Sequence, residues 1–344
     1  RVMSAHHIGQ WARVALLFAA TLMTGAAAAE TPLKFTIDFR IEGPSAPFLV
    51  AIDKSYYKAE GLDVSIDSSA GSLESIERVA SGNYDMGLAD INALIKFRDA
   101  KPGTPIKTVF MFYNRPPFAV IGRKSRGIYV PKDLEGKTLG APAADGAFAQ
   151  WPIFVKSNDI VASKVTIENV SFPVREPMLA AGQVDAVTGI SFSTYVDLKE
   201  KGVPVDDINV LLMADYGVLL YGTVIIVNSK FATENPDTVK GFLRAFLKGL
   251  KETVRQPSTA VESVLKRNSL AKKSVELERL NMAIRENIVT PEVKANGYGG
   301  IDQDRFARAV DQIALTHKFK AAKPKLEDVF DASFLPSPAE RKYR

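Results

Sequence analysis

The stretch VASGNYDMGLAD, residues 79–90, recurs as LAAGQVDAVTGI, residues 179–190, at an offset of 100 positions (179 minus 79). In both copies a Gly that can end a helix is followed by an Asp and then by a short apolar strand. The first copy ends in Asp90, and a carboxylate at the tip of a buried strand is costly unless something pairs with it. The recurrence predicts two similar units, each with polar groups just past the end of a strand.

Short apolar strands alternate with helical segments around both copies. Strands are predicted at 33–38, 62–66 and 84–89 in the first unit, and at 137–141, 165–170 and 184–189 in the second. Such alternation predicts an α/β fold with parallel strands and helical crossovers. Because the unit occurs only twice, it indicates two lobes and not a solenoid.

Two further apolar runs, 118–123 (FAVIGR) and 223–229 (TVIIVNS), are interpreted as paired strands that cross between the lobes. A long amphipathic helix follows from Pro236, and its basic face is interpreted as solvated. Helices near 274–287 and 303–316 are expected to pack on the first lobe. The predicted division is lobe I at 30–118 and 223–330, lobe II at 119–222, and a C-terminal tail at 331–344.

The N-terminal residues 1–29 have the pattern of a signal peptide, with an apolar run and small residues before an expected cleavage at Glu30. An uncleaved anchor is the alternative. The chain contains no Cys, which excludes disulfides and Cys-ligated metals and fits the bacterial periplasm. The formal net charge is +5, with Lys and Arg scattered among acids, which argues against a nucleic-acid-binding role.

The repeated strand ends are expected to face one shared cleft, because ligands of open α/β sheets bind beyond the carboxyl ends of the strands. Asp90 and Asn92 would come from lobe I, and Ser191 and Phe192 from lobe II. Asp90 is also suited to cap the helix that follows it. Asp85 and Asp185 lie at the far ends of their strands and are interpreted as structural.

Three segments carry a resemblance to a known family: FLVAIDKSYYKAEGLDVSI (48–66), VASGNYDMGLAD (79–90) and DLEGKTLGAPAADGAF (133–148). They closely resemble periplasmic solute-binding proteins of the NMT1/THI5-like type, which serve thiamine-pyrimidine, sulfonate, taurine or nitrate uptake. The resemblance covers the whole chain after residue 29, and one departure is Ser55, where family members often carry Gly. It implies a two-lobed class II periplasmic-binding-protein fold, each lobe a mixed sheet flanked by helices, joined by two crossing strands.

By the same resemblance, the protein would be a periplasmic monomer that closes on a small molecule. It would deliver that molecule to an ABC permease driven by a separate ATPase, with no cofactor, no metal and no catalysis. A sensory subunit is an alternative, and so is a metal-free dehydratase with Glu42 or Asp145 as general acid. The fungal pyrimidine synthase that resembles this family uses His, iron and a Cys-rich motif. After residue 29 this chain has one His, His317, and no Cys, which argues against that activity.

Side chains from five patches and from the second crossing are predicted to line the cleft. They are Phe39, Arg40, Glu42 and Phe48; Asp90 and Asn92; Tyr113; Asp145, Gly146 and Trp151; Arg175, Glu176, Ser191 and Phe192; and Tyr221. Arg40 either clamps an anion or, as we favour slightly, pairs with Glu42. Tyr113 either stacks on a flat ligand or packs in the core.

The ligand is predicted from the loop around Asp145. That carboxylate would compete with an anion for the free amides of its own loop, which disfavours a bare oxyanion and favours a ligand with N–H donors. Our leading hypothesis is a flat polar heterocycle, first a thiamine-precursor pyrimidine, with Asp90 or Asp145 accepting from ring amino groups. An aliphatic or aromatic sulfonate or carboxylate is the alternative.

Overall fold

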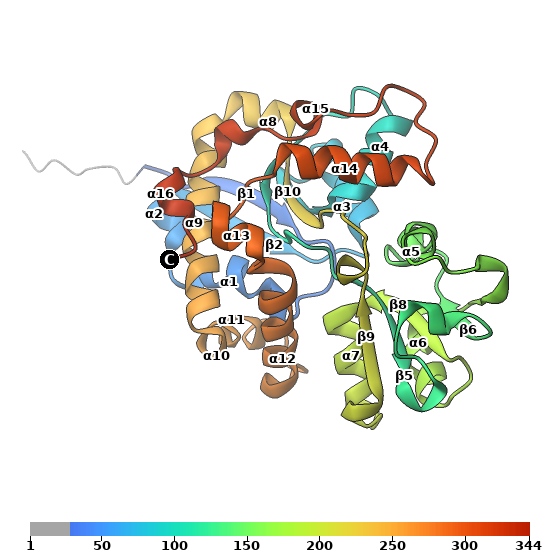
Figure 1. Ribbon diagram of the computed structural model, residues 1–344. Helices are drawn as coiled ribbons and strands as arrows, with labels where there is room; N and C mark the ends of the chain where they lie inside the picture. Colours follow the sequence, from blue (N-terminus) through green and yellow to red (C-terminus); the bar gives the residue numbers. More distant parts are fainter. Residues whose placement is uncertain (1–27) are drawn as a thin grey trace, which may run out of the picture.

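A computed structural model describes residues 28–344 and contains two five-stranded mixed sheets (Figure 1). The first sheet has the order β2 (Leu62–Asp67), β1 (Thr31–Thr36), β3 (Met86–Asp90), β10 (Thr223–Asn228), β4 (Ile106–Met111). The second has the order β7 (Thr166–Asn169), β6 (Thr138–Ala141), β8 (Ala186–Ile190), β5 (Phe118–Arg123), β9 (Ile208–Leu212). In each sheet four strands are parallel and the fourth in the order, β10 or β5, runs antiparallel to both of its neighbours, so the predicted duplication is confirmed. The expected signal peptide lies almost wholly outside the described residues.

The two apolar runs interpreted as paired crossing strands do not pair with each other. β5 lies between β8 and β9, and β10 lies between β3 and β4, so each run is an antiparallel inner strand of a different sheet. The chain passes between the lobes in the segments just before them, 112–117 and 213–222. The prediction of pairing was wrong because an apolar run satisfies its backbone equally well with strands of its own lobe.

Helices cover both sheets. In the first lobe these are α1 (Ala46–Asp53), α2 (Tyr56–Ala59), α3 (Ser72–Ala80), α4 (Ile91–Ala100), α8 (Ser229–Glu234) and α9 (Pro236–Arg255). In the second they are α5 (Trp151–Ser157), α6 (Phe172–Ala180) and α7 (Ser191–Glu200). The start of α5 agrees with the N-terminal preference of Pro152. Similarly, α6 begins at Phe172, where Pro173 suits the first turn, so Arg175 lies within this helix.

The duplicated turn has the same geometry in both lobes. Gly82 and Gly182 have φ of 80° and 75°, the left-handed conformation that ends the preceding helix. Asp85 then accepts a hydrogen bond from the backbone of Lys34 at 2.9 Å, and Asp185 accepts one from Thr138 at 2.8 Å. The structural interpretation of both Asp residues is therefore confirmed. Ser55 also has a left-handed φ, of 59°, which glycine adopts at lower cost.

The C-terminal part of the chain returns to the first lobe and also touches the second. It comprises α10 (Pro257–Ala260), α11 (Glu262–Leu265), α12 (Lys273–Ala283), a π-helical turn (Ile284–Ile288), α13 (Pro291–Asn296), α14 (Gln303–Ala314), α15 (Leu326–Val329) and α16 (Pro338–Arg341). As expected, α12 packs on lobe I, and it also lies against α7 of lobe II, where Arg279 pairs with Asp197 at 2.7 Å. Phe330 forms a bridge with Thr108, which places the segment before the tail beside β4.

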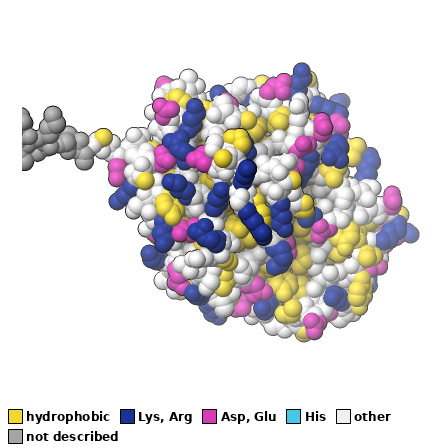
Figure 2. All heavy atoms as spheres, turned by 60° about the vertical axis from the view of Figure 1, so that its left-hand side comes forward, with side chains coloured by type: hydrophobic (Ala, Val, Ile, Leu, Met, Phe, Trp, Pro, Cys, Tyr) yellow, Lys and Arg dark blue, Asp and Glu magenta, His cyan; other side chains and the backbone are white. Residues whose placement is uncertain are grey.

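The face of the molecule that carries α9 is rich in charged side chains. Figure 2, with the α9 side of the molecule forward, shows Lys and Arg side chains gathered over the middle of this face, with Asp and Glu side chains among and around them. On α9, Arg244 donates to Glu60 at 2.8 and 3.0 Å. Within residues 28–344, none of the helices combines the length and the apolar character that a membrane crossing needs.

Candidate ligand-binding cleft

A cavity of about 710 Å³ lies between the two lobes and is lined by both. Its walls come from the loop after β1, the end of β3 and the first part of α4, the start of α3, the crossing segments, the loop after β6, and the starts of α6 and α7. This volume is within the range of small-molecule sites, and strand ends of both sheets contribute to it, as expected for an open α/β fold.

The structure brings nine of the fifteen predicted residues to the wall of this cavity: Phe39, Arg40, Glu42, Asp90, Tyr113, Asp145, Gly146, Arg175 and Phe192. The other six lie behind the wall: Phe48, Asn92, Trp151, Glu176, Ser191 and Tyr221. The expected cleft between the lobes is therefore present. Six of the residues predicted to line it lie one layer behind its wall instead.

On the lobe I side, two carboxyl groups stand at strand ends. Asp90 caps α4, accepting from the backbone of Asn92 and Ala93 at 3.3 and 3.2 Å, as predicted. The Ser72 hydroxyl accepts from the Asp90 backbone at 3.0 Å and donates to the Asp38 carboxylate at 3.4 Å. Burial raises the pKa of both Asp38 and Asp90 to about 6. Within residues 28–344 neither carboxylate has a cationic side chain within ion-pair distance, so both depend on neutral donors.

Glu42 and Tyr113 form the neighbouring wall. Arg40 pairs with Glu42 at 3.1 Å, which confirms the favoured alternative for this arginine. Burial raises the pKa of Glu42, and Arg279 and Arg40 act against that rise. Tyr113 stacks on Phe112 with ring centroids 4.6 Å apart, so its ring is held by core packing while it still contributes to the cavity.

On the lobe II side, two carboxylates share one arginine. Arg175 pairs with Glu176 at 2.8 Å and approaches Asp145 at 3.8 Å. Thr188 donates to Asp145 at 2.7 Å, and Thr194 donates to Glu176 at 3.0 Å. Asp145 therefore already has a cation and a hydroxyl donor beside it, which makes it a weaker candidate than Asp38 or Asp90 for receiving a ligand amino group.

Gly189 explains how this buried network fits. A Cβ at this position would lie 2.3 Å from the Thr194 hydroxyl oxygen and 3.5 Å from the Arg175 guanidinium carbon. The equivalent position in the first lobe is Ala89. Only the lobe II copy of the repeat needs glycine at this point, because a buried ion network lies against its backbone.

Several predicted residues are packing residues. Phe48 is fully buried and stacks on Phe246, with centroids 4.4 Å apart, because α1 directs it into the core of lobe I. Trp151 packs against Phe154 with centroids 5.9 Å apart. Both positions sit in helices whose apolar face is turned towards the core.

The two residues just past the repeated strands are also buried. Asn92 is 1% exposed and donates from its amide to Asp90 and to the Tyr221 carbonyl, at 2.9 and 2.8 Å. Ser191 is 0% exposed and donates to Glu286 at 3.1 Å. Both belong to the first turn of a helix, which directs them beneath the cavity.

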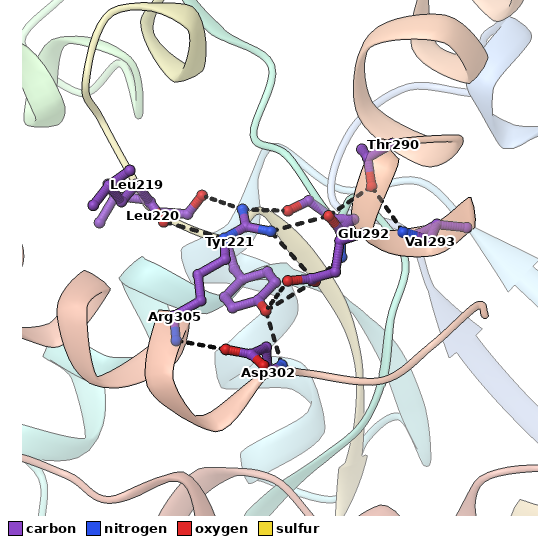
Figure 3. Close-up of polar contacts among 9 residues, drawn as sticks. Leu219, Leu220, Tyr221, Thr290, Glu292, Val293, Asp302 and Arg305 are labelled. Atoms are coloured by element: carbon purple, nitrogen blue, oxygen red, sulfur yellow. Dashed lines mark hydrogen bonds and ion pairs between the residues drawn. The ribbon is translucent and has the colours of Figure 1, made fainter. Parts of the chain in front are cut away.

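Tyr221 belongs to a polar network that joins both crossing segments (Figure 3). Its hydroxyl donates to Glu292 at 2.9 Å, and the Arg305 guanidinium lies 3.7 Å from its ring centroid. Arg305 also donates to the Asn114 side chain and to the Leu220 carbonyl, each at 3.0 Å. Tyr221 thus helps to hold the connection between the lobes and is separate from the cavity wall.

The cavity contains residues that were not predicted from the sequence, notably Asp38, Ser72, Phe112, Phe118 and Phe172. Asp38 lies just after the end of β1, and Asp90 is the last residue of β3. The rule that placed Asp90 at the cleft could therefore have placed Asp38 there as well. Phe172 precedes Pro173 at the start of α6, a position that was not connected with the cleft from the sequence.

The sequence model of a family described as "NMT1/THI5 like" matches residues 43–260, more than half of the chain. The chain belongs to this family. The resemblance noted from the sequence is therefore confirmed.

Proteins similar to this chain in sequence are named for several different roles. The formylaminopyrimidine-binding protein of Halalkalibacterium halodurans is 27% identical over 93% of this chain and 96% of its own length. The riboflavin-binding protein RibY of Chloroflexus aurantiacus is 28% identical over 63% of this chain. A 4-amino-5-hydroxymethyl-2-methylpyrimidine phosphate synthase of Schizosaccharomyces pombe is 27% identical over 61% of this chain. The chain spans only 61% and 62% of the lengths of the latter two proteins.

Among solved structures, the periplasmic aliphatic sulphonate binding protein SsuA from Escherichia coli has a TM-score of 0.68. It is 14% identical over 87% of this chain and 97% of its own. This similarity shows that the chain has the two-lobed periplasmic-binding-protein fold.

Proposed function

We propose that this protein is the extracytoplasmic solute-binding component of an ABC importer. Its ligand is a small, flat heterocycle with amino groups, first a thiamine-precursor pyrimidine, which it delivers to a membrane permease. The observation that carries the proposal is the interlobe cavity with two desolvated carboxylates, Asp38 and Asp90, on one wall.

These carboxylates select for hydrogen-bond donors. A buried carboxylate without a cationic partner gains most from N–H groups, which replace the water it has lost. Both cavity arginines, Arg40 and Arg175, are engaged with Glu42 and Glu176, and the third cation of the wall, Lys96, lies on the Asp90 side and favours the ionised form of that carboxyl. A sulfonate or nitrate would therefore have to compete with these glutamates and face two further negative charges, which favours the heterocycle.

Sequence comparison supports the same choice. The relative that matches over nearly the full length of both chains is named for binding a formylaminopyrimidine. We infer binding and not catalysis. His317 pairs with Asp99 at 2.9 Å and does not line the cavity, and the proposed general acids Asp145 and Glu42 are both engaged in ion pairs.

Calorimetry at pH 7.5 with 4-amino-5-hydroxymethyl-2-methylpyrimidine and with ethanesulfonate tests the proposal. We expect the pyrimidine to bind and ethanesulfonate to give no heat. Asp38→Asn and Asp90→Asn keep the side-chain shape and the cap of α4 but remove the charge, and each should weaken pyrimidine binding by about tenfold to a hundredfold. A protein that binds ethanesulfonate and ignores the pyrimidine would contradict the proposal.

A further inference from the structure

Two phenylalanines in residues 28–344 are more exposed to solvent than the others. Phe39 is 44% exposed and Phe172 is 48% exposed, and they are the two phenylalanines among the exposed large apolar side chains of this part of the chain. Both line the interlobe cavity. Exposed aromatic surface is unfavourable in water, so the coincidence of exposure and position needs an explanation.

The two rings come from opposite lobes. Phe39 lies in the loop after β1 in lobe I, and Phe172 is the first residue of α6 in lobe II. Both positions follow the end of a strand, β1 in one case and β7 in the other. A ligand held between the lobes would therefore meet one ring from each side.

Each ring also has the same kind of support. The Arg40 guanidinium carbon lies 4.8 Å from the Phe39 centroid, and the Arg175 guanidinium carbon lies 5.4 Å from the Phe172 centroid. The guanidinium groups are themselves held by Glu42 at 3.1 Å and by Glu176 at 2.8 Å. An anchored guanidinium on one face of a ring fixes the ring and leaves its other face open.

We propose that Phe39 and Phe172 form an aromatic clamp that holds the ligand ring between their open faces when the lobes close. This inference rests on the proposed function and narrows its ligand class. The ligand must be a planar aromatic ring with both faces free of bulky substituents, since flat rings stack in offset geometry on phenylalanine. An alkyl sulfonate has no such face.

The test uses Phe39→Leu and Phe172→Leu with 4-amino-5-hydroxymethyl-2-methylpyrimidine as the probe. Stacking of one base on one aromatic ring contributes roughly tenfold or more in affinity, so each variant should weaken binding by about tenfold at pH 7.5. Phe172→Tyr keeps the ring and should bind within about threefold of the wild type. Stacking also lowers the ultraviolet absorbance of the bound pyrimidine, and each leucine variant should lose part of that decrease.

Tyr129→Leu is the matched control, because Tyr129 is a 58% exposed aromatic residue of lobe II outside the cavity wall. It should change neither affinity nor absorbance. Full affinity and full absorbance change in both leucine variants would overturn the clamp and leave the proposed function standing. If the wild-type protein binds no pyrimidine, or binds ethanesulfonate in its place, the proposed function fails and the clamp fails with it.

Discussion

The two lobes are built on the same repeat, but their carboxylates at the cavity have different surroundings. In lobe I, Asp38 and Asp90 stand at strand ends with neutral donors around them, and their pKa values are raised to about 6 by burial. In lobe II, Asp145 and Glu176 share one cation, Arg175. Lobe I therefore offers carboxylates without a cationic partner, whereas the lobe II carboxylates already have one.

This difference shows how a duplicated fold can specialise. The features shared by both copies, the turn glycine and the Asp that holds the neighbouring strand, serve the sheet. The features that differ, Asp90 against Ile190 and Ala89 against Gly189, lie at the cavity end of the strand. The positions at which the two copies differ are thus the ones that lie at the cavity.

The largest effect is expected from Arg175→Met, which removes the cation of lobe II. Glu176 and Asp145 would remain buried without their partner, and breaking a buried pair in this way costs about 3–5 kcal/mol of unfolding free energy. Urea unfolding followed by circular dichroism would measure it. Arg40→Met is the matched control, because the Arg40 side chain of lobe I is 68% exposed, and it should cost less than about 1 kcal/mol. Equal losses in the two variants would remove the contrast between the lobes.

A smaller effect is expected in the pH dependence of stability. Asp38 and Asp90 bind protons more tightly in the folded protein, because burial raises the pKa of each from its ordinary value of 3.8 to about 6. Their contribution to the unfolding free energy therefore falls as pH rises from about 4 to about 6. The double variant Asp38→Asn, Asp90→Asn lacks this penalty, so it should be more stable than the wild type at pH 7.5, by roughly 1–3 kcal/mol.

Chemical unfolding of the double variant and the wild type at pH 4 and at pH 7.5 would check this. The advantage of the double variant should shrink as pH falls towards 4, because the wild-type carboxyls then become neutral. An advantage that stays constant with pH would show that these two carboxyls are not the desolvated groups of lobe I.

The sequence was sufficient for the alternation of elements, the duplication and the approximate ends of eight strands, but β4 and β9 were not predicted. It was less informative about the direction of side chains one or two residues beyond the end of a strand. Asn92 and Ser191 follow the correct strands, but the first turn of the next helix directs them under the cavity. A strand-end rule identifies the loop that reaches the ligand and does not say which side chain of the loop does so.

Partners distant in sequence account for the other errors. Asp145 and Arg175 were correctly placed at the cavity, but their mutual neutralisation depends on the contact between two segments about thirty residues apart. Tyr221 was placed near the cleft, yet its position is set by Arg305 and Glu292 from the C-terminal helices. Periodicity and local motifs contain no information on such pairings.

The smallest predicted effect tests the part of the comparison in which the lobes agree. Asp85→Ala and Asp185→Ala each remove a carboxylate that accepts a hydrogen bond from the adjacent strand, and each should lower the unfolding free energy by about 1 kcal/mol. The exposed pair of Asp185 with Arg126 at 3.5 Å should add little to this. Pyrimidine affinity should be unchanged in both variants, because neither residue lines the cavity. A stability loss confined to one lobe would mean that the repeated Asp has different roles in the two copies, and the division between shared scaffold and divergent site would no longer hold.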